Sequence, residues 1–139
     1  MNAERILKLI LRLTGAVCLL AIIAVYMPPS WMAVGHEWSG LGEFPDSPIV
    51  EYLARATSAF YAMFGGLLLL AASDVRRHSR VIAYAAWMGI VYGVTMSLIN
   101  MCIGMPWYWA LGEVATAAPL GAVILLLLRA ARRAGSAAG

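Results

Sequence analysis

Three apolar stretches of this sequence each carry an ionisable or amide side chain near one end. Arg55 lies within EYLARATSAFYAMFGGLLLLAA, Asn100 ends VIAYAAWMGIVYGVTMSLIN, and Glu113 follows WYWALG. Such groups are unfavourable among apolar residues unless an opposite charge or hydrogen bonds compensate them, which makes them candidate functional residues. An arginine and a glutamate at one depth in a bilayer are suited to binding a small amphipathic ligand or a lipid headgroup. They are equally suited to pairing with each other.

The elements that would position these groups are membrane-spanning helices. Of the 139 residues, 63% are hydrophobic and 12% are charged, whereas soluble domains average about 45–50% apolar and about 25% charged residues. A soluble domain this small has too little interior to bury so much apolar surface. Four stretches are longer than the roughly 20 residues that cross a hydrocarbon core of about 30 Å, and we place them at 6–27, 49–72, 81–103 and 107–128. Because lipid cannot hydrogen-bond an open backbone, each is expected to be a helix, which predicts an all-α polytopic membrane protein.

The basic residues predict the orientation of these helices. Nine of the ten fall before or within the first two turns of the first span, between spans two and three, or after span four: Arg5, Lys8, Arg12, Arg76, Arg77, Arg80, Arg129, Arg132 and Arg133. The loop 28–48 has no Lys or Arg and carries Glu37, Glu43 and Asp46. The positive-inside rule then predicts an antiparallel bundle with both termini in the cytoplasm. Anionic lipid is a sufficient partner for the basic clusters, so no nucleic acid is expected.

The loop between spans one and two, PPSWMAVGHEWSGLGEFPDSP, is expected to contain a short helix that ends at Trp38. Trp31, Val34 and Trp38 would share one face of it. Such a helix is typical of a segment lying flat in the outer, periplasmic interface. We further expect a single domain, 1–139, whose residues 129–139 form a flexible basic cytoplasmic tail.

Small residues recur at four-residue spacing on three spans. Their spacing forms grooves that let helix backbones approach closely, which stabilises helix pairs in lipid. These packing candidates are Ala54, Ser58, Ala62 and Gly66 on span two, Ala85, Gly89, Gly93 and Ser97 on span three, and Ala117 and Gly121 on span four. The pattern suggests that spans two and three meet along their ridges. The alternative is that one ridge faces a second copy of the chain.

The polar groups fall at similar depths. With a rise of about 1.5 Å per residue, Arg55 lies about 8 Å, Glu113 about 9 Å and Asn100 about 5 Å inside the same face of the bilayer. The candidate cluster comprises Arg55, Glu113, Asn100, Ser58, Glu51, Tyr52, His36 and Glu37. Glu51 precedes Arg55 by four residues, so Arg55 has a local acid as an alternative partner to Glu113. The sequence leaves these two pairings open.

Other chemistry finds little support in the residue pattern. His36, Glu37, Glu43 and Asp46 match no metal-site spacing, and both histidines lie outside the spans, where they would not ligate an embedded haem. No Gly-rich phosphate loop or Ser-His-Asp set at one depth is present. We therefore expect no metal, no cofactor and no catalytic residue.

The stretch FPDSPIVEYLARATSAFYAMFGG, followed by DVRRHS and GMPWYWALGE, resembles a group of small four-helix bacterial membrane proteins. The resemblance covers nearly the whole chain. It implies a four-helix architecture and a bacterial inner membrane, and it implies no activity. The layout is also loosely similar to sterol-isomerase-like bundles, but the residue pattern does not match that family, so no catalytic residue is transferred.

These observations favour a non-enzymatic protein of the bacterial inner membrane. We expect it to act as a homo-oligomer or as a small subunit of a membrane assembly, with lipids and other membrane subunits as partners. The alternative is binding or transport of a small amphipathic ligand or lipid in a periplasm-facing pocket around Arg55 and Glu113. A lipid-modifying enzyme is the third possibility.

Overall fold

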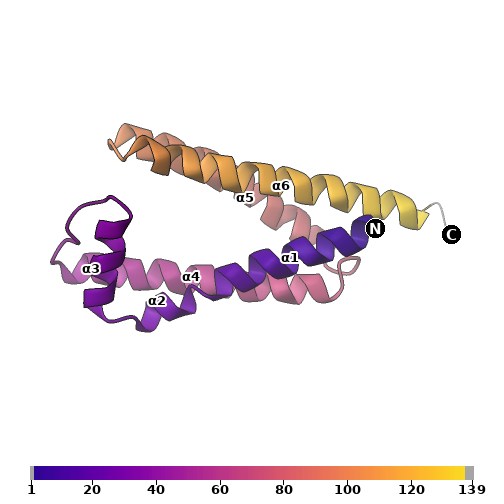
Figure 1. Cartoon of the computed structure of the whole chain (residues 1–139). Helices are drawn as coiled ribbons and strands as arrows, with labels where there is room; N and C mark the ends of the chain where they lie inside the picture. The colour runs from indigo at the N-terminus through magenta and orange to yellow at the C-terminus, as the bar shows by residue number, and fades with distance from the viewer. Residues whose placement is uncertain (1, 137–139) are drawn as a thin grey trace. The chain divides into compact units, whose positions relative to one another are not determined.

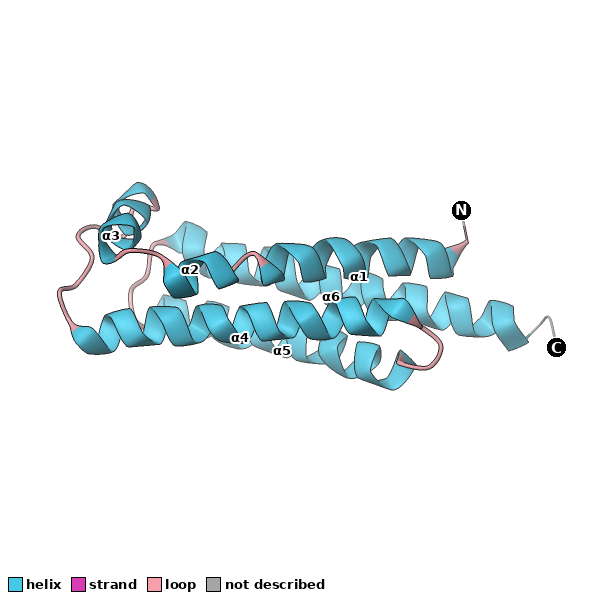
Figure 2. Ribbon diagram, turned by 90° about the horizontal axis from the view of Figure 1, so that it is seen from below, coloured by secondary structure: helices cyan, strands magenta, loops and turns pink. Residues whose placement is uncertain are grey.

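The computed structural model describes residues 2–136, which form helices joined by turns and loops. Figure 1 shows the helices along the chain, and Figure 2 shows helices and loops without a strand in this part of the chain. The helices are α1 (Ala3–Leu19), α2 (Ile22–Tyr26), α3 (Pro29–Trp38), α4 (Pro48–Ser73), α5 (Ser79–Cys102) and α6 (Trp107–Ser136). The prediction of an all-α protein is confirmed for these residues.

Four helical segments are long and apolar enough to cross a membrane. They are Ala3–Tyr26, which joins α1 and α2, and then Pro48–Ser73, Ser79–Cys102 and Trp107–Arg133. The number of predicted spans is therefore confirmed, by length and composition. Helix α6 continues to Ser136, so the tail expected at 129–139 is helical over its described part. Alanine and arginine have high helix propensity, and cations stabilise a helix C-terminus. Residues 137–139 of that predicted tail lie outside the described residues.

Contacts within the chain group the residues into two units, described separately below. Unit 1 comprises Met1–Leu11 and Leu70–Gly139, and unit 2 comprises Arg12–Leu69. The grouping divides α1 and α4 between the units. The prediction of a single four-helix domain stays a prediction.

In unit 1, α5 and α6 form an antiparallel hairpin and lie side by side in both views (Figures 1 and 2). A Cβ atom on Gly93 would lie 3.0 Å from the Ala117 Cβ, and one on Gly121 would lie 2.5 Å from the Ala86 carbonyl oxygen. These glycines therefore bring the two backbones together. The ridge of span three thus contacts span four at Gly93, whereas its sequence pattern suggested span two. The short turn between the two helices makes them immediate neighbours.

In unit 2, α1 and α4 cross at two glycines. A Cβ on Gly65 would lie 2.6 Å from the Gly15 carbonyl oxygen and 2.5 Å from the Leu19 backbone nitrogen. A Cβ on Gly15 would lie 2.9 Å from the Gly65 carbonyl oxygen. Gly66, the glycine of the predicted ridge on span two, has no described atom within 4 Å of its Cβ position. Gly65 forms the crossing with α1, and a helix contact at Gly66 stays a prediction.

The first span is interrupted between α1 and α2. The interruption lies at Leu20 and Ala21. Around it, backbone N–H groups donate to carbonyls three residues back, and the donors are Ala21, Ile23 and Ala24. This tighter turn separates α1 from α2 without a proline or glycine at the break. Helix α2 ends at Tyr26, and the extended backbone of Met27 (φ −66°, ψ 137°) leads into Pro28 and Pro29.

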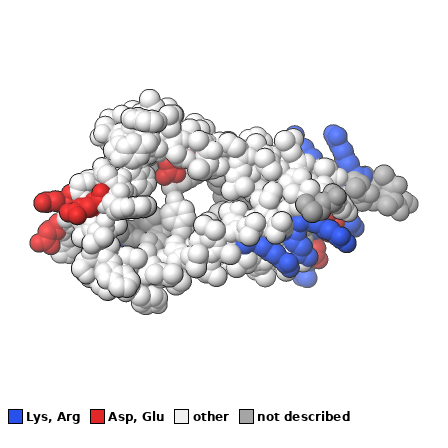
Figure 3. Space-filling view, viewed as in Figure 1, with Lys and Arg blue, Asp and Glu red and all other residues white. Residues whose placement is uncertain are grey.

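Basic side chains of unit 1 gather where α1 begins, α4 meets α5 and α6 ends (Figure 3). Two contacts hold this end together: Arg76 pairs with Glu4 at 3.1 Å, and Arg132 donates to the Ser79 carbonyl at 3.2 Å. Asp74 accepts a hydrogen bond of 3.0 Å from the Arg77 backbone N–H. That hydrogen bond is the main reason why the pKa of the Asp74 carboxyl lies below its usual value.

Candidate functional site

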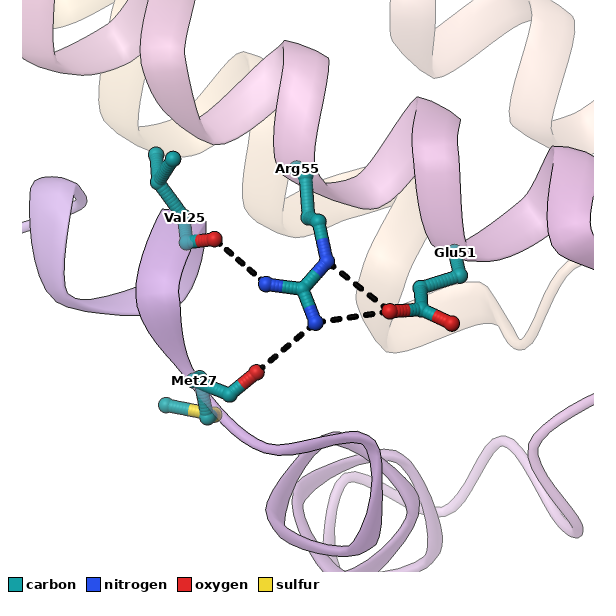
Figure 4. Close-up of polar contacts among 4 residues, drawn as sticks. All are labelled: Val25, Met27, Glu51 and Arg55. Atoms are coloured by element: carbon teal, nitrogen blue, oxygen red, sulfur yellow. Dashed lines mark hydrogen bonds and ion pairs between the residues drawn. The ribbon is translucent and has the colours of Figure 1, made fainter.

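Arg55 is held by four hydrogen bonds within unit 2 (Figure 4). Its Nε donates to Glu51 Oε1 at 2.9 Å, and one terminal nitrogen donates to the same oxygen at 2.6 Å and to the Met27 carbonyl at 3.0 Å. The other terminal nitrogen donates to the Val25 carbonyl. The side chain thus links the start of α4 to the end of α2.

The two prolines after α2 explain why the Val25 carbonyl needs a donor. In a continuing helix, the Val25 carbonyl would accept from the N–H four residues later, which is position 29. Pro29 has no N–H, and Pro28 removes the donor for the preceding carbonyl in the same way. At the end of an apolar span, an unsatisfied carbonyl is unfavourable. Arg55 supplies the missing donor, and Glu51 balances its charge.

This arrangement leaves Arg55 little capacity for a ligand. A guanidinium group has five N–H donors, and four hydrogen bonds are already formed. Its ion pair is local: the Arg55–Glu51 distance is 2.6 Å, and their side chains are 28% and 36% exposed. Of the two partners considered for Arg55, Glu51 is the one it contacts in unit 2. Glu113 belongs to unit 1, and its pairing with Arg55 stays a prediction.

Other predicted residues of unit 2 have local roles. Ser58 Oγ donates to the Ala54 carbonyl of its own helix at 2.8 Å. The Tyr52 side chain is exposed. His36 Nδ1 lies 2.9 Å from the Gly42 carbonyl oxygen, and its ring packs edge-on against Phe44 with centroids 5.4 Å apart. These contacts use His36 to hold the loop after α3, and Glu37 beside it is exposed.

In unit 1, Ser97 is a buried hydrogen-bonding link between α5 and α6. Its hydroxyl donates to the Ala110 carbonyl and accepts from the Val114 N–H at 3.2 Å. Asn100 is also buried, with 8% of its surface exposed. Its backbone carbonyl accepts a hydrogen bond of 2.9 Å from the Met105 N–H in the turn between the helices. Both residues therefore stabilise the hairpin.

Glu113 is the acidic member of the predicted cluster that lies in unit 1. Its side chain is half-buried, and within the described part of unit 1 its carboxylate forms no hydrogen bond or ion pair. A pocket of about 320 Å³ lies beside it on α6, lined by Tyr108, Trp109, Gly112, Glu113 and Thr116. Glu113 is consequently the acidic group with free bonding capacity in this pocket.

Comparison with known protein families, curated proteins and solved structures gives no match. The resemblance to small four-helix bacterial membrane proteins therefore gains no support from these comparisons. The interpretation of the site depends on its own geometry.

Several residues of the Arg55 site and of the α6 pocket were not predicted from the sequence. Pro28 and Pro29 follow span one directly, but the carbonyls of Val25 and Met27 were not counted as acceptors. For Val25 the signal was present, because Pro29 has no N–H to donate to that carbonyl. For the α6 pocket, Tyr108, Trp109 and Gly112 precede Glu113 by five, four and one residues, and Thr116 lies three residues after it. Helical spacing could have grouped these residues.

Proposed function

We propose that this chain is a four-span protein of the bacterial inner membrane that acts through helix contacts, as a homo-oligomer or as a small subunit of a membrane assembly. The observation that carries the proposal is the use of Arg55. The most conspicuous intramembrane charge is committed to hydrogen bonds that close a helix end. Ser97 is likewise committed to the α5–α6 hairpin. Intramembrane polar groups used in this way stabilise packing.

The open face of α4 supports an assembly role. Gly66 leaves a notch there beside Met63, which is 69% exposed. A glycine flanked by larger apolar residues lets a second transmembrane helix approach closely. Another copy of the chain and a different membrane subunit both fit this notch.

The topology that we propose places both termini in the cytoplasm, because nine of the ten basic residues fall on that side of the four spans. In this topology the spans form an antiparallel bundle, and α3 lies in the periplasmic interface. The exposed side chains of Trp31, Val34 and Trp38 support that placement of α3.

Cysteine crosslinking in native membranes tests the assembly proposal. Cys18 and Cys102 are free cysteines and would first be replaced by alanine. In that background, Met63→Cys is expected to crosslink α4 to a second copy or to another subunit. Leu126→Cys, on an equally exposed position of α6, is the matched control and is expected to give less product. If native mass spectrometry finds single chains without partners and Met63→Cys gives no product, the assembly proposal is wrong.

Ligand binding is the second candidate function. The α6 pocket beside the unpaired Glu113 favours it. The pocket is of the size that small-molecule sites occupy, about 300–1,000 Å³. Because Arg55 is already bonded, Glu113 is the charged residue that we assign to this function.

A further inference from the structure

Hydrogen-bond acceptors line the α6 pocket, where a ligand would bind. Thr116 Oγ1 donates its hydrogen to the Gly112 carbonyl at 2.7 Å and more weakly to the Glu113 carbonyl at 3.3 Å. Only the lone pairs of that hydroxyl remain for a ligand. The Glu113 carboxylate, unpaired within the described part of unit 1, accepts hydrogen bonds as well. Tyr108 and Trp109 add aromatic rings, whose faces attract cations.

From this chemistry we propose that the pocket binds the primary ammonium headgroup of a membrane lipid. An ammonium group has three N–H donors and no acceptor, which complements a carboxylate and a hydroxyl oxygen. An ionised carboxylate in a membrane span also requires a compensating charge. This inference rests on the ligand-binding candidate and specifies the sign and class of its ligand.

The position of the pocket favours a lipid over a cationic side chain of another protein. Glu113 follows the start of α6 by six residues, about 9 Å along the axis. Tyrosine and tryptophan at the end of a span are typical of the headgroup region. The site is a pocket of about 320 Å³, and lipid headgroups surround it at high local concentration. A fixed helix of another protein would have to place its lysine or arginine at this depth.

Gly112 provides a variant that fills the pocket. A Cβ at this position would have no described atom within 4 Å, so larger side chains extend into open space without a clash. Gly112→Leu should therefore fold normally, and its helix propensity is higher than that of glycine. It should nevertheless exclude a headgroup from the space beside Glu113.

Native mass spectrometry of the purified full-length chain tests the proposal. The protein is titrated with palmitoyl-oleoyl phosphatidylethanolamine, with the corresponding phosphatidylcholine, whose ammonium has no N–H, and with the anionic phosphatidylglycerol. Phosphatidylethanolamine is expected to bind best. Glu113→Gln should weaken its binding about tenfold or more, because a hydrogen bond to a charged group is worth about 1.5–3 kcal/mol. Gly112→Leu should weaken it at least as much, while Glu43→Gln, which changes an exposed loop acid, should not.

Equal binding of phosphatidylethanolamine to the wild type and to Glu113→Gln would overturn the proposal, as would equal binding of all three lipids. So would a protein subunit that is retained by the wild type and lost from Glu113→Gln, because the compensating cation would then come from a protein. Circular dichroism and size-exclusion chromatography verify that each variant is folded. Oligomeric state is read from the same spectra, so failure of the assembly proposal is distinguishable from failure of the lipid site.

Discussion

Gly65 and Gly66 are adjacent in α4, and we predict opposite outcomes when each is replaced by alanine. The Cβ of Gly65→Ala would lie 2.5 Å from the Leu19 backbone nitrogen and 2.6 Å from the Gly15 carbonyl oxygen. Both are backbone atoms, which cannot rotate away as a side chain can. Normal contact between carbon atoms is about 3.5–4.0 Å, so α1 and α4 would have to separate by about 1 Å. The Cβ of Gly66→Ala would meet no described atom within 4 Å.

The magnitude follows from comparing the two variants. Each places alanine in the interior of the same helix, so each gains about 1 kcal/mol of helix propensity. That gain cancels in the difference between them and leaves the overpacking at Gly65, which typically costs about 1–3 kcal/mol. We therefore expect Gly66→Ala to be neutral or up to about 1 kcal/mol more stable than the wild type. Gly65→Ala should be less stable than Gly66→Ala by about 1–3 kcal/mol.

The assay is reversible unfolding in mixed micelles at increasing mole fractions of dodecyl sulfate, followed by circular dichroism. The free energy of unfolding of both variants is compared with that of the wild type under one set of conditions. Equal values for the two variants would refute the crossing of α1 and α4 at Gly65. A larger loss for Gly66→Ala would instead support the ridge that the four-residue spacing suggested.

Three further predictions use the same unfolding assay. Arg55→Met should lower the free energy of unfolding by about 2–3 kcal/mol, because charge-assisted hydrogen bonds are lost; an unchanged value would mean that the α2 carbonyls do not need this donor. Ser97→Ala should lower the free energy of unfolding by about 0.6 kcal/mol, the average for interhelical hydrogen bonds in lipid. A decrease of more than about 2 kcal/mol would indicate that Ser97 does more than link α5 to α6. Because the folded state lowers the pKa of Asp74, its contribution is present above the unfolded pKa of about 3.9 and is lost as the pH falls below it. Asp74→Asn should remove that acid-dependent part, and an unchanged pH profile would contradict the hydrogen bond from Arg77.

The number and extent of the spans could be predicted from sequence because hydropathy, charge and proline coincide at their ends. The second span was expected at 49–72, and α4 covers Pro48–Ser73. The C-terminus of the fourth span shows the limit of this reasoning. Arginines beyond Leu128 indicate where an apolar segment ends, but they do not end a helix. Helix α6 therefore continues to Ser136.

Helix contacts were harder to predict because they depend on the rotation of each helix. Neighbouring residues in an α-helix differ by about 100° around the axis, so Gly65 and Gly66 face different directions. The four-residue spacing of small residues selected Gly66, and it omitted Gly15 because span one has no regular ridge. On span three the spacing included Gly93, which does lie in a helix contact. Its partner depended on which helix was nearest, and the small-residue pattern does not contain that information.

The sequence pattern indicates acidic side chains as partners of Arg55, but backbone carbonyls at the end of an apolar span are its partners as well. In water, a carbonyl left without a donor by proline is hydrated, so it makes no demand on a distant side chain. At the end of an apolar span, where water is scarce, such a carbonyl does require a donor from another part of the protein. Pro28 and Pro29 and Arg55 are therefore parts of one arrangement, in which the prolines remove donors from α2 and the guanidinium replaces one of them at Val25. Because Glu51 already neutralises that guanidinium, we propose a different cation for Glu113, and this is the lipid headgroup proposed for the α6 pocket.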